Sequence, residues 1–229
     1  MCTMEFLTND YTLDLTGGFP LSTDSMVLAD FVKLPKNARV LELGSGCGTL
    51  GLLLCARDKS CTVTGIELDK TAHAAAMKNI ARNSLEGRLS SICADLRTMP
   101  PAPGAFQVCL SNPPYFSGGA RHQRNPGARQ EDTCTPRDLF AAAAKALQWG
   151  GDFFLVHKPD RLAQLCFEAS AAGLEPKRLR LIRHRPDAPI SLILLSCRKG
   201  GKPGLQIDEL TLHNTDGTPT ADYCRIYHI

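Results

Sequence analysis

The chain has 229 residues, of which 43% are hydrophobic and 21% charged, and its formal net charge is +3. These values are ordinary for one soluble globular domain with a real core, and the charge is too small to identify a partner. Ten cysteines occur without any C-x-x-C pair, so we expect reduced thiols in a cytoplasmic protein, and neither a disulfide framework nor a metal site.

The N-terminus and the apolar runs predict neither export nor membrane insertion. Residues Met1–Asp10 lack a basic segment followed by a long apolar core, so no secretory signal is expected. No run approaches the ~18 apolar residues that a membrane span needs. We expect a single domain over residues 1–229, with an N-terminal segment (1–38), a core (39–199) and a C-terminal strand and tail (200–229).

The first elements are a loop and a helix. Adjacent glycines and a proline predict a loop over Thr8–Pro20. Ser22–Asp24 are residue types that cap helices, and the apolar residues of Ser25–Lys33 have helical spacing up to Pro35. Thr23 therefore either caps this helix or contacts a ligand, and the pattern leaves both open.

A strand, a glycine-rich turn and a helix come next, at Arg39–Leu43, Gly44–Gly51 and Leu50–Arg57. Glycines between a strand and a helix let the backbone approach a ligand closely. The N-terminus of the helix adds free N–H groups at the same place. This turn is therefore a candidate binding site.

The glycines of the turn fit two patterns. Gly46, Gly48 and Gly51 match G-x-G-x-x-G, the fingerprint of dinucleotide-binding proteins. Gly44, Gly46 and Gly48, with the acidic Glu42 just before them, resemble instead motif I of class I S-adenosylmethionine-dependent methyltransferases. The ligand of that motif carries an amino acid rather than a pyrophosphate. A tight turn without any ligand is the third possibility.

Carboxylates follow the next two expected strands. Cys61–Ile66 ends at Glu67, whose carboxylate can accept hydrogen bonds from both hydroxyls of a ribose. This role suits NAD and S-adenosylmethionine equally. After a helix at Lys70–Asn83, the strand Leu89–Ala94 is followed by Asp95, which either faces a ligand or only starts a surface turn.

The most specific signal follows the short apolar run Phe106–Leu110. Two prolines after Asn112 prevent the strand from continuing and lead the chain out of the sheet. The Asn112 carboxamide oxygen can accept one hydrogen of an exocyclic NH2 group, and the Pro113 carbonyl can accept the other. Tyr115 offers a ring on which a flat substrate can stack. The alternative is a tight turn capped by an asparagine.

A long aperiodic segment, Ser117–Thr135, lies beside this stretch. Loops of that length in compact domains are usually functional or disordered. Its arginines suit a phosphate-bearing substrate, although a merely solvated loop is the alternative. We expect the substrate to contact Pro114, Phe116, Arg121, Arg124 and Arg129.

The second half alternates helices and strands and then ends in strands. Lys177–Arg185 carries six basic residues that alternate with apolar ones, which predicts a strand with one charged side. That side is either a solvated edge or a nucleic-acid contact. Ile190–Cys197 is a fully apolar strand. The other expected elements are a helix at Pro136–Leu147, a turn at Gly150-Gly151, a strand at Asp152–His157, a helix at Arg161–Ala172, and a short strand and an aromatic, basic tail within Leu210–Ile229.

The glycine turn, Glu67, Asp95 and Asn-Pro-Pro-Tyr follow successive strands in this order. Together they resemble a class I S-adenosylmethionine-dependent amino-methyltransferase over nearly the whole chain. The resemblance implies a Rossmann-like, doubly wound α/β fold with a seven-stranded, mostly parallel sheet whose last strand is antiparallel. It also implies S-adenosylmethionine as cofactor, with Asp95 on its adenine amino group. The implied cofactor-binding residues are Thr23, Glu42, Gly44, Gly46, Gly48, Glu67, Asp95 and Asn112, and the implied catalytic residues are Asn112, Pro113 and Tyr115.

Three further features are similar to the bacterial tRNA1(Val) adenine-37 N6-methyltransferase family. They are Gly17–Ala29, the stretch Ser111–Phe116 with the arginine-containing loop behind it, and Gly200–Pro203 with the tyrosine-rich tail. The resemblance implies N6-methylation of an adenine in RNA. The partner would be the anticodon loop of a tRNA, with no metal and no membrane involved.

Other readings remain. A methyltransferase acting on a glutamine of a release factor needs the same two acceptors, but that family usually has a helical N-terminal domain, and only about 38 residues precede the first core strand. An rRNA or DNA adenine methyltransferase would share the site. An NAD-dependent dehydrogenase would need a catalytic Tyr/Lys or His/Asp set at a strand end. A non-catalytic RNA-binding module would not need Glu67 or Asp95.

Overall fold

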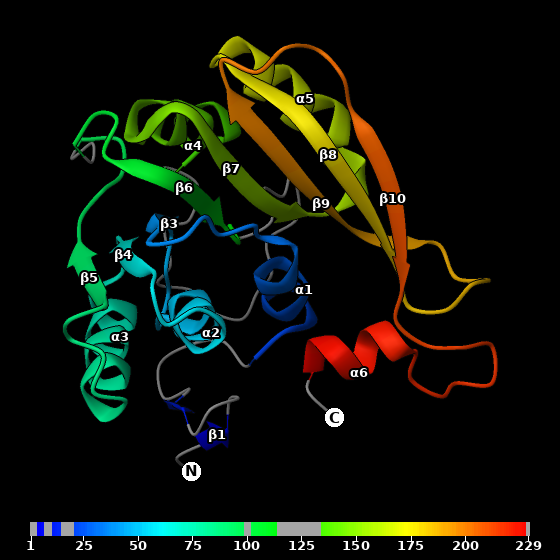
Figure 1. The fold of residues 1–229 in the computed structure, drawn as a ribbon, viewed down its shortest axis with the longest axis horizontal. Helices are drawn as coiled ribbons and strands as arrows, with labels where there is room; N and C mark the ends of the chain where they lie inside the picture. The colour runs from blue at the N-terminus through cyan, green and yellow to red at the C-terminus, as the bar shows by residue number, and fades with distance from the viewer. Residues whose placement is uncertain (1–3, 7–10, 15–20, 99–101, 114–133, 228–229) are drawn as a thin grey trace, which may run out of the picture.

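The computed structural model describes residues 4–6, 11–14, 21–98, 102–113 and 134–227 (Figure 1). The expected doubly wound α/β fold is confirmed: helices cover both faces of one mixed sheet. The sheet has the strand order β10-β8-β9-β7-β6-β3-β4-β5. Its strands are β3 (Arg39–Leu43), β4 (Thr62–Glu67), β5 (Leu89–Cys93), β6 (Phe106–Ser111), β7 (Leu147–His157), β8 (Leu174–Arg183), β9 (Ile190–Lys199) and β10 (Gln206–Thr211).

The predicted count of seven strands is wrong, because the described residues form eight strands in this sheet. The antiparallel strand was expected to be the last one, and this is also wrong: β9 lies between β7 and β8 and runs opposite to both, whereas the last strand, β10, is parallel to β8. The strand that was not expected in this place is β10, which pairs in parallel with the outer side of β8. Asp208 of β10 accepts hydrogen bonds from Arg178 and Arg180 of β8, at 2.7 and 2.6 Å. The basic strand is therefore paired on both sides, and the solvated edge predicted for it is wrong.

A second correction concerns β7. The turn predicted at Gly150-Gly151 is absent, since both glycines lie inside a strand that starts at Leu147. Gly150 has φ +77°, and the pairing of β7 with β6 shifts register between Phe106 and Val108. Between these two pairs β7 is three residues longer than β6, so the glycines lie in an irregular stretch of the strand, where Gly150 takes the left-handed conformation that glycine allows.

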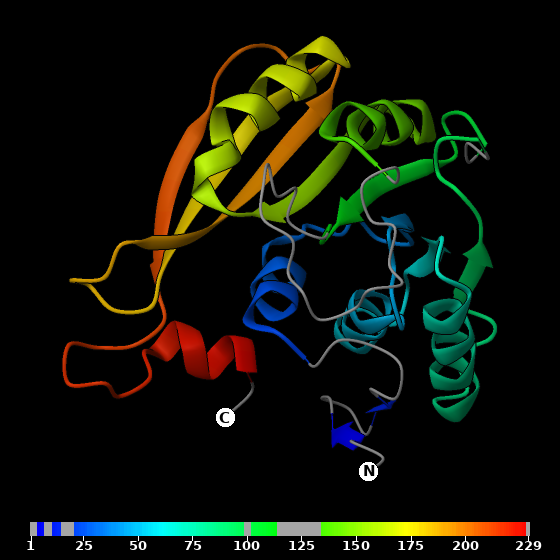
Figure 2. The same ribbon diagram turned by 180° about the vertical axis from the view of Figure 1, so that it is seen from behind.

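The helices form two layers around two apolar clusters (Figures 1 and 2). One layer contains α1 (Thr23–Phe31), α2 (Thr49–Arg57) and α3 (Lys70–Arg82). The other contains α4 (Pro136–Ala146) and α5 (Leu162–Ala171), the latter preceded by the 3-10 turn η1 (Pro159–Arg161). The last helix, α6 (Ala221–Tyr227), packs beside α1. No helix among the described residues is both long and apolar enough to cross a membrane.

The N-terminal segment is attached to α3 by two asparagines. It forms a small hairpin of β1 (Met4–Phe6) and β2 (Thr12–Asp14), so the loop predicted over 8–20 contains a strand. The buried Asn79 side chain accepts from the Asp14 N–H (2.8 Å) and donates to the Asp14 carbonyl (3.0 Å). It also donates to the Cys47 carbonyl (3.0 Å), so one amide joins the hairpin to the glycine turn. Asn83 bonds the backbone of Thr12 in the same way.

Replacing Asn79 with Ala should lower the free energy of unfolding by ~2–4 kcal/mol, because three backbone groups lose a buried partner. Urea unfolding followed by circular dichroism measures this change. The matched control is Lys78→Ala, an exposed position on the same helix, which should stay within ~0.5 kcal/mol of the wild type. Equal stability of the two variants would mean that the Asn79 contacts do not hold the hairpin.

Candidate functional site

The candidate site lies at the carboxyl edge of the parallel strands β6, β3, β4 and β5. In the sheet, Glu42 of β3 pairs with Leu110 of β6, and Glu67 of β4 pairs with Cys93 of β5. Two residues beyond the first pair, Gly44 and Asn112 leave the sheet at the same level. Segments that are far apart in sequence therefore meet here, since parallel neighbours end at one edge.

The glycine turn contains three residues with positive φ angles, and two of its glycines have no packing neighbour among the described residues on the side where a Cβ would lie. Gly44, Gly46 and Gly48 have φ angles of +73°, +54° and +88°. A Cβ on Gly44 or Gly46 would meet no atom of the described residues within 4 Å, so with respect to them the side that these glycines expose is open. The turn is held by the N–H groups of Gly44 and Ser45, which both donate to the Ile66 carbonyl at 2.9 and 3.0 Å. The positive φ angles favour glycine, and the open side leaves room for a ligand.

Gly51 has a different function from the other glycines. A Cβ there would lie 2.6 Å from a methyl carbon of Leu89, so this glycine lets α2 pack closely on β5. In the G-x-G-x-x-G pattern, Gly46 lies on the open side of the turn, a Cβ on Gly48 would touch Ala76 at 3.5 Å, and Gly51 belongs to a helix–sheet contact.

Glu42 is a buried carboxylic acid directly behind the turn. Its side chain is 2% exposed, and its Oε2 accepts a hydrogen bond from the Gly51 N–H at 3.1 Å. Burial raises its pKa to about 8, the Gly51 hydrogen bond opposes this rise, and the negative charge of Glu67 adds to it. An acid with this pKa exchanges a proton near neutral pH and can respond to a cationic group in the turn.

Glu67 connects the end of β4 to the glycine turn. Its Oε2 accepts from the Gly46 N–H (2.7 Å) and its Oε1 from the Asp69 N–H (2.8 Å). A carboxylate has about four lone-pair positions, so two acceptor positions remain for a ligand hydroxyl pair. Its position at the predicted strand end is as expected.

Asp95 is more engaged than expected. It forms a two-point ion pair with Arg97, with the shortest contact at 2.6 Å, and also accepts from the Arg97 N–H. These hydrogen bonds hold the pKa of Asp95 below its ordinary value. Its carbonyl accepts from the Thr98 N–H, so it also starts a turn. A ligand amino group at Asp95 would share this carboxylate with Arg97.

Asn112 points its amide at a residue that the sequence analysis did not select. Its Nδ2 donates to the Oγ of Ser25 on α1 at 3.2 Å. No described residue donates to its Oδ1, nor to the Pro113 carbonyl. The preceding Ser111 donates from Oγ to the Leu43 carbonyl (2.7 Å), which fixes the end of β6 against β3. Two acceptors are thus available where the strand ends.

Ser25 is 7% exposed, and its Oγ also lies 3.4 Å from the Oγ of the cap residue Ser22. The sequence shows it only as one of several small polar residues at the start of the helix, and this is the one signal that it offered. Thr23, expected at the cofactor, is the first residue of α1 behind the cap Ser22. Burial raises the pKa of the Tyr227 hydroxyl on α6, and the nearby Thr23 side chain opposes this rise.

Several predicted residues cannot be placed. The catalytic candidate Tyr115 and the substrate candidates Pro114, Phe116, Arg121, Arg124 and Arg129 lie outside the described residues. Within the described part of the chain, no three His, Cys, Asp or Glu side chains are grouped so that they could hold a metal ion.

Sequence comparisons identify relatives over most of the chain. The family model "Methyltransferase small domain" matches residues 21–170. A tRNA1(Val) (adenine(37)-N6)-methyltransferase of Bacteroides fragilis is 31% identical over 181 residues, covering 77% of this chain and 76% of that protein. The protein of the same name from Vibrio parahaemolyticus is 29% identical over 215 residues, with 92% and 88% coverage.

Solved structures show the same fold at low identity. A predicted O-methyltransferase from Agrobacterium tumefaciens superposes with a TM-score of 0.76 at 20% identity, over 90% of this chain and 96% of that one. Geranyl diphosphate C-methyltransferase from Streptomyces coelicolor, solved with S-adenosyl-L-homocysteine, gives a TM-score of 0.57 at 11% identity, with 76% and 78% coverage.

The raised pKa of Glu42 predicts a pH-dependent stability. The folded protein keeps a proton on Glu42 up to pH about 8, whereas the unfolded chain releases it above about pH 4.5. The free energy of unfolding should therefore fall as the pH rises from 4.5 to 8, by up to ~4 kcal/mol from this group, since one pKa unit is worth ~1.4 kcal/mol. In Glu42→Gln this part of the dependence should vanish, and the variant should exceed the wild type at pH 8. Urea unfolding at pH 5, 6, 7 and 8 measures both profiles, and identical profiles would contradict the raised pKa.

Proposed function

The chain belongs to the methyltransferase small domain family and is an S-adenosylmethionine-dependent methyltransferase; on this premise we propose that it methylates the N6 amino group of an adenine in RNA, namely adenine 37 of tRNA1(Val). The substrate is supported by the names of two relatives, and this chain covers 76% and 88% of their own length. The site supports the class of acceptor atom, as follows.

The observation that carries the proposal is the orientation of Asn112. Because Nδ2 donates to Ser25, Oδ1 remains to accept a hydrogen bond at the sheet edge. The Pro113 carbonyl follows directly and belongs to a residue without an N–H. An amino group presents two hydrogens and so suits two acceptors, whereas a hydroxyl presents only one. This pair therefore favours an amine over a hydroxyl substrate.

The residues of the glycine turn fit S-adenosylmethionine. The open side of Gly44 and Gly46 leaves room for a ligand, and the buried Glu42 lies behind it. Glu42 would face the amino-acid end of the cofactor, Glu67 the ribose and Asp95 the adenine. When bound, the cofactor supplies an electrophilic methyl group on a sulfonium.

The chain's own task is to hold a poor nucleophile in a reactive state. The lone pair of an exocyclic adenine nitrogen is delocalised into the ring. Hydrogen bonds to Asn112 Oδ1 and to the Pro113 carbonyl favour a pyramidal nitrogen and stabilise the positive charge that develops on it. No general base is needed, because the methylated nitrogen is acidic enough to lose its proton to water. Alignment contributes as well, since orientation of the reactants is worth ~7–11 kcal/mol in favourable cases.

The acceptor atoms also limit the substrate's conformation. An adenine stacked and paired inside a helix cannot bring its amino group to the end of β6, so it must be flipped out or already unpaired. A nucleotide of an anticodon loop meets this condition.

The test is methyl transfer to unmodified tRNA1(Val) transcripts, followed by mass spectrometry of the nucleosides. We expect N6-methyladenosine with the natural transcript and none when guanine replaces adenine 37. Asn112→Ala should lower kcat ~10²-fold, by analogy with the loss of one oxyanion-hole donor, with unchanged affinity for S-adenosylmethionine.

The control variant is Gln148→Ala, an exposed amide at the opposite end of the sheet, which should keep wild-type activity. Methylation of the guanine-37 transcript, or of a glutamine in a release factor instead of any RNA, would refute the proposed substrate. Wild-type turnover by Asn112→Ala would refute the assigned site.

Ser25 is proposed as the residue that positions the Asn112 amide. Ser25→Ala removes one neutral hydrogen bond, so kcat should fall about 3- to 10-fold while KM for both substrates stays constant. Ser25→Thr, which keeps the hydroxyl, should restore most of kcat. If Thr is as slow as Ala, or if Ala is as fast as the wild type, the hydroxyl does not orient the amide.

A further inference from the structure

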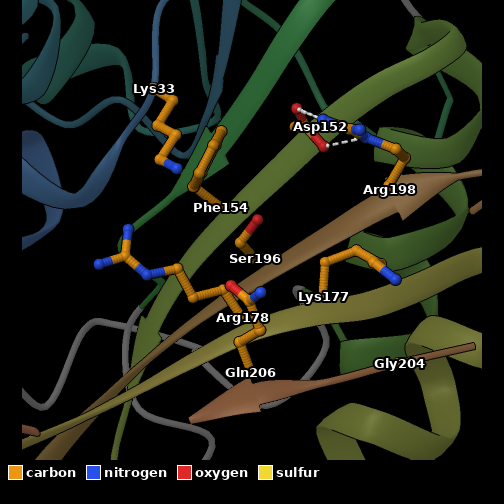
Figure 3. A pocket seen from close by; sticks show the side chains of 9 residues that line it. All are labelled: Lys33, Asp152, Phe154, Lys177, Arg178, Ser196, Arg198, Gly204 and Gln206. Carbon is orange, nitrogen blue, oxygen red and sulfur yellow. Dashed lines mark hydrogen bonds and ion pairs between the residues drawn. The ribbon is translucent and has the colours of Figure 1, made fainter. Parts of the chain in front are cut away.

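A second candidate site lies away from the sheet edge, on the face of the sheet that α1 covers only in part. Beyond the end of α1, a hollow of about 220 Å³ opens above β7, β9 and β8. Phe154 and Ser196 lie at its centre, and the cationic side chains surround them (Figure 3). The lining residues are Lys33, Asp152, Phe154, Lys177, Arg178, Ser196, Arg198, Gly204 and Gln206.

The lining has an excess of positive charge. It contains four cationic side chains and a single carboxylate, Asp152. That carboxylate is held by Arg198 through two hydrogen bonds of 2.9 and 2.8 Å (Figure 3). Arg178 is paired with Asp208 outside the lining. Across the described part of the chain, no carboxylate lies within ion-pair distance of Lys33 or Lys177.

The donors left over suit a phosphate. Lys33 has no hydrogen bond to any described residue, and Lys177 uses one of its three donors on the Lys202 carbonyl at 2.8 Å. The Ser196 side chain lies between them (Figure 3). Lysine ammonium groups and arginine forks are the usual partners of phosphate oxygens. The hollow is smaller than the ~300–1,000 Å³ typical of pockets for drug-sized ligands, which favours a small anionic group.

The hollow and the reactive amide are connected by one short segment of the chain. Ser25 on α1 accepts a hydrogen bond from Asn112, and Lys33 in the lining lies two residues beyond the end of α1 at Phe31. This closeness in the chain is the ground for assigning both places to a single RNA.

We propose that this hollow binds a backbone phosphate of the RNA substrate, with Lys33 and Lys177 as its main contacts. The proposal rests on the function proposed above. In this proposal the RNA backbone binds at the hollow, whereas the amino group reacts at the carboxyl edge of the sheet. Phosphate contacts position a nucleic acid without reading its sequence, so the hollow contributes affinity and register.

The test compares Lys33→Gln/Lys177→Gln with the matched control Lys59→Gln/Lys78→Gln, which removes the same charge from exposed positions of other elements. The Kd for a tRNA1(Val) transcript is measured between 50 and 300 mM salt. The hollow variant should bind several-fold more weakly at low salt, and its log–log salt slope should be smaller by about 0.7–0.9 than that of the control. Its Kd for S-adenosylmethionine and its kcat at saturating RNA should equal the wild-type values, which shows that the fold is intact.

A salt slope equal to that of the control overturns the inference. Binding of inorganic phosphate is titrated in parallel at constant ionic strength. If the hollow variant loses phosphate binding while its salt slope for RNA equals that of the control, the inference is also overturned, because the hollow then binds a small free anion and not RNA. Formation of N6-methyladenosine by the wild type is measured in the same preparations. If the wild type methylates RNA and the slopes agree, only the hollow is wrong, whereas a wild type that neither binds nor methylates RNA refutes both proposals.

Discussion

The structure depends on one constraint, that neighbouring parallel strands end at a common edge. The strands β6, β3, β4 and β5 are parallel and adjacent, so Asn112, the glycine turn, Glu67 and Asp95 leave the sheet side by side. The hydroxyl of Ser111 extends the contact between β6 and β3 past the last ladder pair by bonding the Leu43 carbonyl. Since prolines cannot continue the ladder, the chain must turn away just there.

Helix α1 contacts three parts of the molecule: the end of β6, the basic strand β8 and the helix α6. Its buried Ser25 contacts the amide of Asn112, and its first residue Thr23 lies near Tyr227 of α6, the helix that packs beside it. Near its other end, Asp30 is paired with Arg225 of α6, and Phe31 lies 4.7 Å below the guanidinium of Arg178. A short amphipathic element at the N-terminal side therefore connects the reactive strand end with the basic strand β8 and with α6.

The cofactor half combines an open turn with a buried acid. The side of Gly44 and Gly46 on which a Cβ would lie holds no atom of the part of the chain that the structure describes, whereas Gly51 is required by the close approach of Leu89. Glu42 lies between these two environments, and its burial keeps it protonated up to about pH 8. Burial of the Glu42 carboxyl group is unfavourable for its charged form, and it places a group that titrates near neutral pH behind the turn. Shifted pKa values of this kind are common at ligand-binding sites.

Local period, composition and proline chemistry encode the core strands and helices, the glycine turn, the acids at two strand ends and the Asn-Pro-Pro exit, so these could be predicted from the sequence. The sequence did not reveal that β10 would pair with β8, that Gly150 would lie within an irregular stretch of β7, or that Ser25 would meet Asn112 across 87 positions. Those outcomes depend on which elements become neighbours in space, and charge pairing at Asp208 and burial at Ser25 exist only once the sheet has assembled. Tertiary structure alone decided them, since a contact between distant segments has no local signature.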